Sequence, residues 1–272
     1  MGFMDRLGTG WRLSLKALDI VRQNKQLIIF PMVSFAALVV VSMTFVGIMA
    51  GSGSFSEGGF GFGDFILTFM LYFSCYFVIV FFNVALIHCA TLILNGQEAT
   101  LEAGLKKAMS RLPVILGWSA VSASVGMLLN AAEENAGWAG KIVIGLIGFA
   151  WSLMTYFVVP VLAYERVGVI ESIKRSGAVF KQTWGENAGG AVGFGLVSLI
   201  AFAVIFLGAF ILGLINVWFG IVVGVLAMTF VSCILSAGKT VFIAALYRYA
   251  AEKEVSLFTE DELSGAFVQK TA

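Results

Sequence analysis

Hydrophobic residues in this chain occur mostly in long, nearly unbroken runs, and short segments between the runs carry most of the charge. A helix needs about 20 apolar residues to cross a hydrocarbon core of roughly 30 Å. Six runs are long enough: Leu27–Ala50, Phe65–Leu94, Leu112–Leu129, Lys141–Ala163, Ala188–Ile215 and Val217–Tyr247. The third is the weakest, because Ser119, Ser122 and Ser124 dilute it. The pattern predicts an all-α, polytopic membrane protein with six transmembrane helices.

Three of the charged segments have apolar residues at helical spacing. Those positions are Trp11, Leu15, Leu18 and Val21; then Leu101, Leu105, Met109 and Leu112; then Ile170, Ile173, Phe180 and Trp184. Each segment leads into a predicted span, so we expect three two-span hairpins, each preceded by an amphipathic helix. The chain is then one membrane domain, 1–272, with weak internal repeats at 11–94, 95–163 and 164–250 and a tail at 251–272.

Charge sets the expected orientation. With 60% hydrophobic and 12% charged residues, the chain has too few polar side chains to cover a water-soluble fold. All three amphipathic segments are basic, whereas the connections on the opposite side carry Glu57, Asp64, Glu133 and Glu134, with Lys141 as the one basic residue there. The positive-inside rule therefore places both termini, the 251–272 tail and the amphipathic helices in the cytoplasm. The net charge of +1 gives no argument for a nucleic-acid partner.

The basic amphipathic segments suggest contact with lipid. Cationic side chains beside an apolar face can extend along the hydrocarbon boundary and reach headgroup phosphates, as in an in-plane membrane helix. The candidate contacts to anionic headgroups on the cytoplasmic side are Lys106, Lys107, Arg111, Lys174, Arg175 and Lys181. Two alternatives stay open: a solvated basic face that only sets topology, and packing of the apolar face against the helix bundle.

Three polar residues fall inside predicted spans: Asn83, His88 and Lys239. Polar groups at such depth are costly and usually face a bundle interior, a water cavity or each other. They could line a polar path for a small solute or ion. The alternatives are a hydrogen-bonded structural His88 and a Lys239 whose ammonium extends to the cytoplasmic headgroups.

No residue pattern indicates catalysis. A single histidine cannot build a histidine-based metal cluster, and no nucleophile elbow or paired acidic motif occurs. The cysteines have no paired spacing, so we expect free thiols rather than disulfides. We therefore expect no cofactor, no metal and no enzymatic activity.

Glycine is the other prominent signal in the apolar runs. Gly189, Gly193, Gly220 and Gly224 give small-xxx-small spacing in the last two spans. Such patches allow close helix approach in lipid. They predict tight packing within the chain or, alternatively, contact between copies in a homo-oligomer.

Pro160 lies near the end of the fourth run, where its missing N–H is expected to kink the helix. It belongs to "FVVPVLAYERVGVIESIKRSGAVFKQTWGE". Together with "FFNVALIHCATLILNGQEATLEAGLKKAMSRLPVILGW" and "ALYRYA", this stretch resembles a prokaryotic six-span integral membrane family classed as a domain of unknown function. The resemblance covers Trp11 to Phe267, and its signature is Pro160, Glu165, Ser176, Trp184, Gly185 and Glu186. It implies a bacterial or archaeal inner-membrane location, and it carries no catalytic or binding residues.

The sequence thus favours a non-enzymatic inner-membrane component that contacts lipid and associates with itself. The alternative is a small-solute or ion transporter or channel with a polar path near Asn83, His88 and Lys239.

Overall fold

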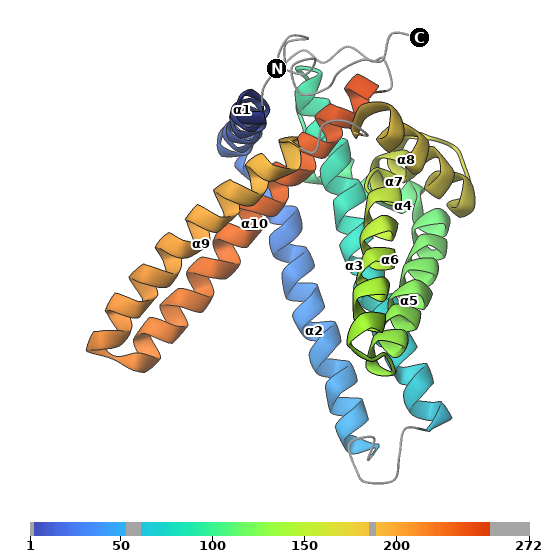
Figure 1. The fold of residues 1–272 in the computed structure, drawn as a ribbon. Coiled ribbons are helices and arrows are strands. Elements are labelled where there is room, and N and C mark those ends of the chain that lie inside the picture. Colours follow the sequence, from blue (N-terminus) through green and yellow to red (C-terminus); the bar gives the residue numbers. More distant parts are fainter. Residues whose placement is uncertain (1–2, 53–60, 185–188, 251–272) are drawn as a thin grey trace. The chain divides into compact units, whose positions relative to one another are not determined.

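The computed structural model describes residues 3–52, 61–184 and 189–250, and all regular structure within these ranges is helical (Figure 1). The helices in chain order are α1 Phe3–Gln23, the short 3-10 helix η1 Lys25–Ile28, α2 Ile29–Gly51, α3 Phe62–Leu94, α4 Leu101–Ser110, α5 Leu112–Glu134, α6 Trp138–Met154, α7 Val158–Tyr164, α8 Val169–Trp184, α9 Gly189–Ile215 and α10 Val217–Ala250.

Within the described ranges, six helical stretches are long and apolar enough to cross a membrane. They are Lys25–Gly51, Phe62–Leu94, Leu112–Glu134, Trp138–Tyr164, Phe194–Ile215 and Val217–Arg248. The prediction of an all-α protein with six transmembrane helices is confirmed for these residues. The third stretch, which its serines made the weakest, is a continuous helix, and the hydroxyls of Ser119 and Ser124 are satisfied by carbonyls four residues back on α5.

The chain divides into two compact units. The first contains residues up to Met32, Leu86–Leu101 and the chain from Val179 onward. The second contains Val33–Ala85 and Glu102–Ala178. Helices α2, α3, α4 and α8 each contribute residues to both units, α4 only through Leu101 to the first.

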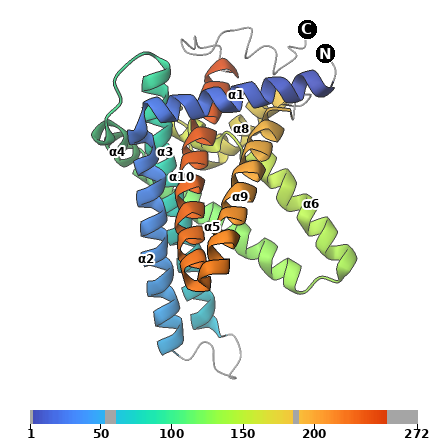
Figure 2. The ribbon, with the colours of Figure 1, turned by 90° about the vertical axis from the view of Figure 1, so that its left-hand side faces the viewer.

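In the first unit, α1 lies across α9 and α10 (Figure 2). The crossing is close at Gly238 of α10, where an added Cβ would lie 2.6 Å from Leu18 Cδ2 and 3.3 Å from Phe194 Cζ. The Phe194 and Phe242 rings, on α9 and α10, pack with centroids 5.6 Å apart. The absence of a side chain at Gly238 therefore lets the basic N-terminal helix approach the two long helices.

In the second unit, α5 and α6 run antiparallel and share a stacked pair of indoles, Trp118 and Trp151, with centroids 5.9 Å apart. Helix α5 also contacts α3, since a Cβ added at Gly126 would lie 3.3 Å from Tyr76 Oη. Aromatic stacking and small residues hold this group of helices, as expected in lipid, where apolar burial alone gives little gain.

Local chemistry fixes two helix ends. Gly96 has φ +70°, and the bonds from Gly96 N–H to Ile93 O and from Gln97 N–H to Leu92 O close a Schellman motif after α3. Between α9 and α10, the side chain of Asn216 accepts a hydrogen bond from Phe219 N–H at 3.0 Å and caps α10. The turn at Gly96 explains why α3 ends there, and the cap at Asn216 explains why α10 begins directly after it.

Candidate functional site

The fourth predicted span is interrupted rather than only kinked. Helix α6 ends at Met154 and α7 begins at Val158, so Pro160 lies in the first turn of a new helix, where its missing N–H removes no intrahelical bond. The N–H of Phe157 donates to Ser176 Oγ on α8 at 2.9 Å, and both residues are buried. Two signature residues, Pro160 and Ser176, therefore act at one feature: the proline fits the first turn of the new helix, and the serine satisfies a backbone donor at the interruption.

The signature residue Glu165 follows α7 and forms an ion pair with Arg175 of α8, with Oε1 and Nε 3.0 Å apart. This pair ties the segment after α7 to the middle of α8. Trp184 is the last residue of α8, and Gly185 and Glu186 lie outside the described residues. The carboxylate of Glu165 partly neutralises the guanidinium of Arg175. Arg175 is therefore a weaker candidate for a headgroup contact than a lysine or arginine that carries no ion pair.

A basic cluster forms where α4, α5 and α7 meet. Lys107, in the last turn of α4, holds its Nζ 5.3 Å from the ring centroid of Tyr164, the last residue of α7. Burial lowers the pKa of Lys107 below its ordinary value, and the positive charges of Arg111 and Arg166 lower it further. Lys107, Arg111 and Arg166 are therefore electrostatic neighbours, which we call the basic cluster.

The α4 helix packs through its smallest residues. Gly104 and Ala108 are buried, whereas the larger Leu105 and Met109 are exposed, Met109 to 58%. At about 100° per residue, the predicted apolar arc of Leu101, Leu105, Met109 and Leu112 lies beside the buried stripe rather than on it. The apolar face of this helix is thus left largely outside the protein core.

The α8 helix repeats this arrangement. Its buried residues include Ser172 and Ser176, while Ile170, which belongs to the predicted apolar arc, is 61% exposed. Ile173 and Phe180 are half-buried. The two serines and Val179 make the internal contact, and Ile170 stays outside.

In α1, in the other unit, Ser14 and Ala17 are buried and Leu15 is 43% exposed. Val21, which the spacing assigns to the same apolar arc as Leu15, is buried. The apolar arc of α1 is therefore divided between the protein core and the outside.

The candidate headgroup contacts differ in exposure. Lys106, Lys174, Arg175 and Lys181 are exposed, whereas Lys107 and Arg111 are half-buried. Two members of the site, Arg166 and Tyr164, were not among the predicted headgroup contacts. Their position in the sequence could have identified them, because both follow the proline-containing end of the fourth apolar run, on the same expected side of the membrane as Arg111.

The three intramembrane polar residues are divided between the two units. Asn83 belongs to the second unit, and His88 and Lys239 belong to the first. Five residues along α3 separate Asn83 from His88, which places them about 140° apart on the helix. Asn83 and His88 are half-buried, and Lys239 is exposed. The proposed polar path therefore stays a prediction.

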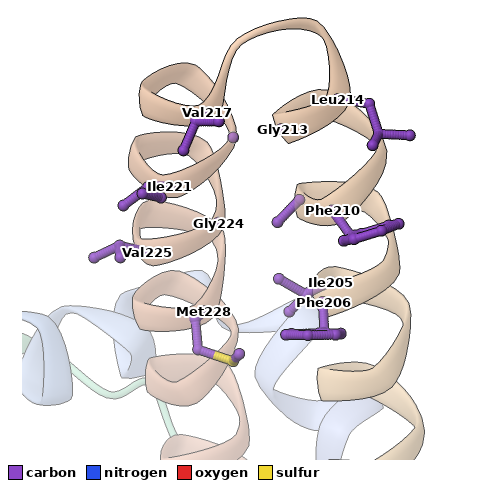
Figure 3. A pocket seen from close by; sticks show the side chains of 12 residues that line it. Ile205, Phe206, Phe210, Gly213, Leu214, Val217, Ile221, Gly224, Val225 and Met228 are labelled. Atoms are coloured by element: carbon purple, nitrogen blue, oxygen red, sulfur yellow. The ribbon is translucent and has the colours of Figure 1, made fainter.

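The α9–α10 hairpin carries an apolar groove of about 570 Å³ near its turn (Figure 3). Its walls include Phe206, Phe210 and Ile221, and its floor includes glycines. A Cβ added at Gly220 would lie 2.6 Å from Gly213 Cα, and one added at Gly224 would lie 2.8 Å from Ala209 Cβ. The predicted small-residue spacing at Gly220 and Gly224 thus serves packing within the hairpin.

The described residues contain no group of three or more His, Cys, Asp or Glu side chains that could hold a metal ion. Comparison with known proteins gives one match: a family model described as a family of unknown function, DUF6159, matches residues 63–257. No curated protein and no solved structure matches the chain.

Proposed function

Since this chain belongs to DUF6159, a family of unknown function, we propose from its own residues that it is a non-enzymatic membrane component that contacts anionic lipid and associates with itself. The proposal places the protein in a prokaryotic inner membrane with both termini in the cytoplasm. Its lipid contacts are the basic helices α1, α4 and α8.

One observation carries the lipid part of the proposal: small residues of α4 and α8 are buried, while Leu105 and Met109 of α4 and Ile170 of α8 are exposed beside cations. A helix docked in water would be expected to bury Met109 and Ile170 first, because each large apolar side chain gains about 1.5–3 kcal/mol on full burial. At the end of a membrane span, the acyl boundary can cover such side chains while neighbouring lysines reach the headgroups. The observed burial pattern fits an in-plane membrane helix better than it fits a solvated basic helix.

Self-association is the second part of the proposal, and the α9–α10 hairpin motivates it. Gly220 and Gly224 pack against the neighbouring helix within the hairpin, so their spacing no longer argues for contact between copies. The apolar groove supports self-association instead. Exposed Phe206, Phe210 and Trp218 surround this region. Light scattering of the protein extracted in mild detergent should give more than one copy per particle, and a monomer would remove this part.

The lipid part is tested by fluorescence at paired adjacent positions. The chain has three cysteines, Cys75, Cys89 and Cys233, which are first replaced by alanine. Single cysteines at Met109 or Ile170 then carry an environment-sensitive fluorophore in vesicles that contain brominated acyl chains. We expect a blue-shifted emission that the bromines quench.

The matched controls are Ser110 and Glu171, which are also exposed and directly follow the test positions. Because a step of one residue turns about 100° around a helix, their fluorophores should report water. Equal quenching at Met109 and Ser110, and at Ile170 and Glu171, would show that these helices do not lie in the interface. If anionic lipid does not change the thermal stability of the protein, the proposed headgroup contact is wrong.

Transport is a second candidate, and the interrupted fourth span favours it, because transporters often build sites at helix breaks. Reconstituted vesicles with Lys239→Met and His88→Ala variants test the predicted polar path. Reduced solute or ion flux in both variants supports the path, and unchanged flux in both removes it.

A further inference from the structure

Three cations from three segments of the second unit come together where Lys107 Nζ lies over the ring of Tyr164, since Arg111 follows Lys107 by four residues and Arg166 follows Tyr164 by two. Lys107 lies in the last turn of α4, Arg111 directly precedes α5, and Arg166 lies two residues after the end of α7. Helix α5 and the interrupted pair α6–α7 are two of the candidate membrane spans. The cluster therefore lies at span ends, at the depth where headgroups meet the hydrocarbon.

The position of Lys107 is defined by an aromatic ring. Its Nζ lies 5.3 Å from the centroid of Tyr164, and the side chain is half-buried. A ring face attracts a cation through its quadrupole but carries no net negative charge. The ammonium of Lys107 is thus held in place without being neutralised by this contact.

The neighbouring charges add repulsion. The positive charges of Arg111 and Arg166 act on Lys107, and together with burial they lower its pKa. Like charges brought together in a partly buried place cost free energy until an anion arrives. The neighbouring Glu165 directs its carboxylate to Arg175 of α8.

The segment that carries Arg166 is held close to α5. A Cβ added at Gly117 of α5 would lie 2.9 Å from Val169 Cγ2, at the start of α8. This contact fixes the connection between α7 and α8 beside the helix that Arg111 precedes. The cluster is therefore positioned by packed backbone rather than by flexible side chains alone.

We propose that Lys107, Arg111 and Arg166, with Tyr164 beneath Lys107, form a binding site for a phosphate group. Guanidinium groups bind phosphate through paired N–H donors, and an ammonium adds a compact charge. A bound phosphate also relieves the repulsion among the three cations. If the phosphate belongs to a lipid headgroup, this inference rests on the proposed function. A soluble phosphate compound would present the same chemical group to the site.

The experiment measures thermal stabilisation of the full chain in detergent micelles against added ligand. The probes are phosphatidylglycerol, phosphatidylcholine, glycerol phosphate and inorganic phosphate. The variants are Lys107→Met and Arg166→Gln, and Arg166 is exposed, so that variant should fold. The control is Lys141→Met, which removes the same charge from an exposed position in the first turn of α6, outside the predicted headgroup contacts.

We expect the apparent dissociation constant to rise about fivefold with either test variant and to change less than twofold with the control, since one cation near a headgroup contributes roughly that factor. Binding of phosphatidylglycerol without glycerol phosphate identifies the lipid as the source. Comparable binding of the soluble phosphates identifies a soluble source.

The two proposals can fail separately. If the wild type prefers phosphatidylglycerol over phosphatidylcholine but both test variants bind it unchanged, the phosphate site is wrong and lipid contact stands. If inorganic phosphate binding depends on Lys107 and Arg166 while the wild type shows no preference for anionic lipid, the site stands and the proposed lipid contact fails. Absence of both effects overturns both proposals.

Discussion

The α9–α10 hairpin offers the most direct test of the packing in the first unit. Replacing Gly220 with alanine puts the new methyl carbon 2.6 Å from both Cα and N of Gly213 and 2.7 Å from the carbonyl oxygen of Ala209. All three are backbone atoms, so no side chain can rotate out of the way. Since nonbonded carbons pack at about 3.5–4.0 Å, the two helices must separate by about 1 Å. Overpacking of this kind typically costs about 1–3 kcal/mol.

The measurement is the thermal unfolding midpoint of the purified protein in detergent, followed by circular dichroism. We expect Gly220→Ala to lower the midpoint by several degrees, because each kcal/mol shifts a chain of this size by about 2–4 °C. Gly213→Ala is the matched control on the facing helix. A Cβ at Gly213 would meet no atom within 4 Å, and alanine favours a helix over glycine by about 1 kcal/mol.

The reasoning has a clear refutation. A midpoint for Gly220→Ala at or above the wild-type value would mean that the hairpin is not packed as closely as described. An equal loss in Gly213→Ala would mean that both glycines matter for another reason, such as backbone flexibility at the turn.

Two further predictions concern the second unit. Ser176→Ala leaves the buried Phe157 N–H without the hydroxyl that accepts its bond, so we expect a loss of about 1–3 kcal/mol in the free energy of unfolding in detergent. Ser172→Ala removes a bond to the carbonyl of Gly168, the residue directly before α8, and should cost clearly less. Equal losses would contradict this reasoning. Burial and the neighbouring arginines lower the pKa of Lys107, so between that pKa and 10.5 the unfolded chain binds more protons than the folded one, and stability should rise with pH. This rise, measured as the midpoint of the wild type relative to Lys107→Met, should be absent if Lys107 is neither buried nor close to other cations.

Some of the local structure followed from the sequence. Pro160 predicted a distortion near the end of the fourth span, since a proline cannot donate within a helix. The sequence did not predict a full interruption, because the acceptor that stabilises it, Ser176, lies 19 residues away on another helix. A backbone donor can leave its helix only where such a partner is present, and spacing along the chain does not reveal that partner.

The basic cluster shows the same limit. Lys107 and Arg111 were predicted as headgroup contacts because they flank an apolar arc and a span. Arg166 and Tyr164 were not, since their relation to Lys107 depends on α7 and α8 folding back beside α4 and α5. Charge counts give the side of the membrane, whereas the identity of electrostatic neighbours requires the fold.

The sequence by itself determined that this chain is helical and which six apolar runs form helical stretches that can cross a membrane, because the length of an apolar run has to match the thickness of the hydrocarbon core. Only the tertiary structure decided which face of each basic helix packs inward. In α4 the small residues Gly104 and Ala108 are buried and Met109 is not, since close approach of backbones in lipid depends on what the neighbouring helix presents. Periodicity identifies an apolar face, and the packed neighbours determine whether protein or membrane covers it.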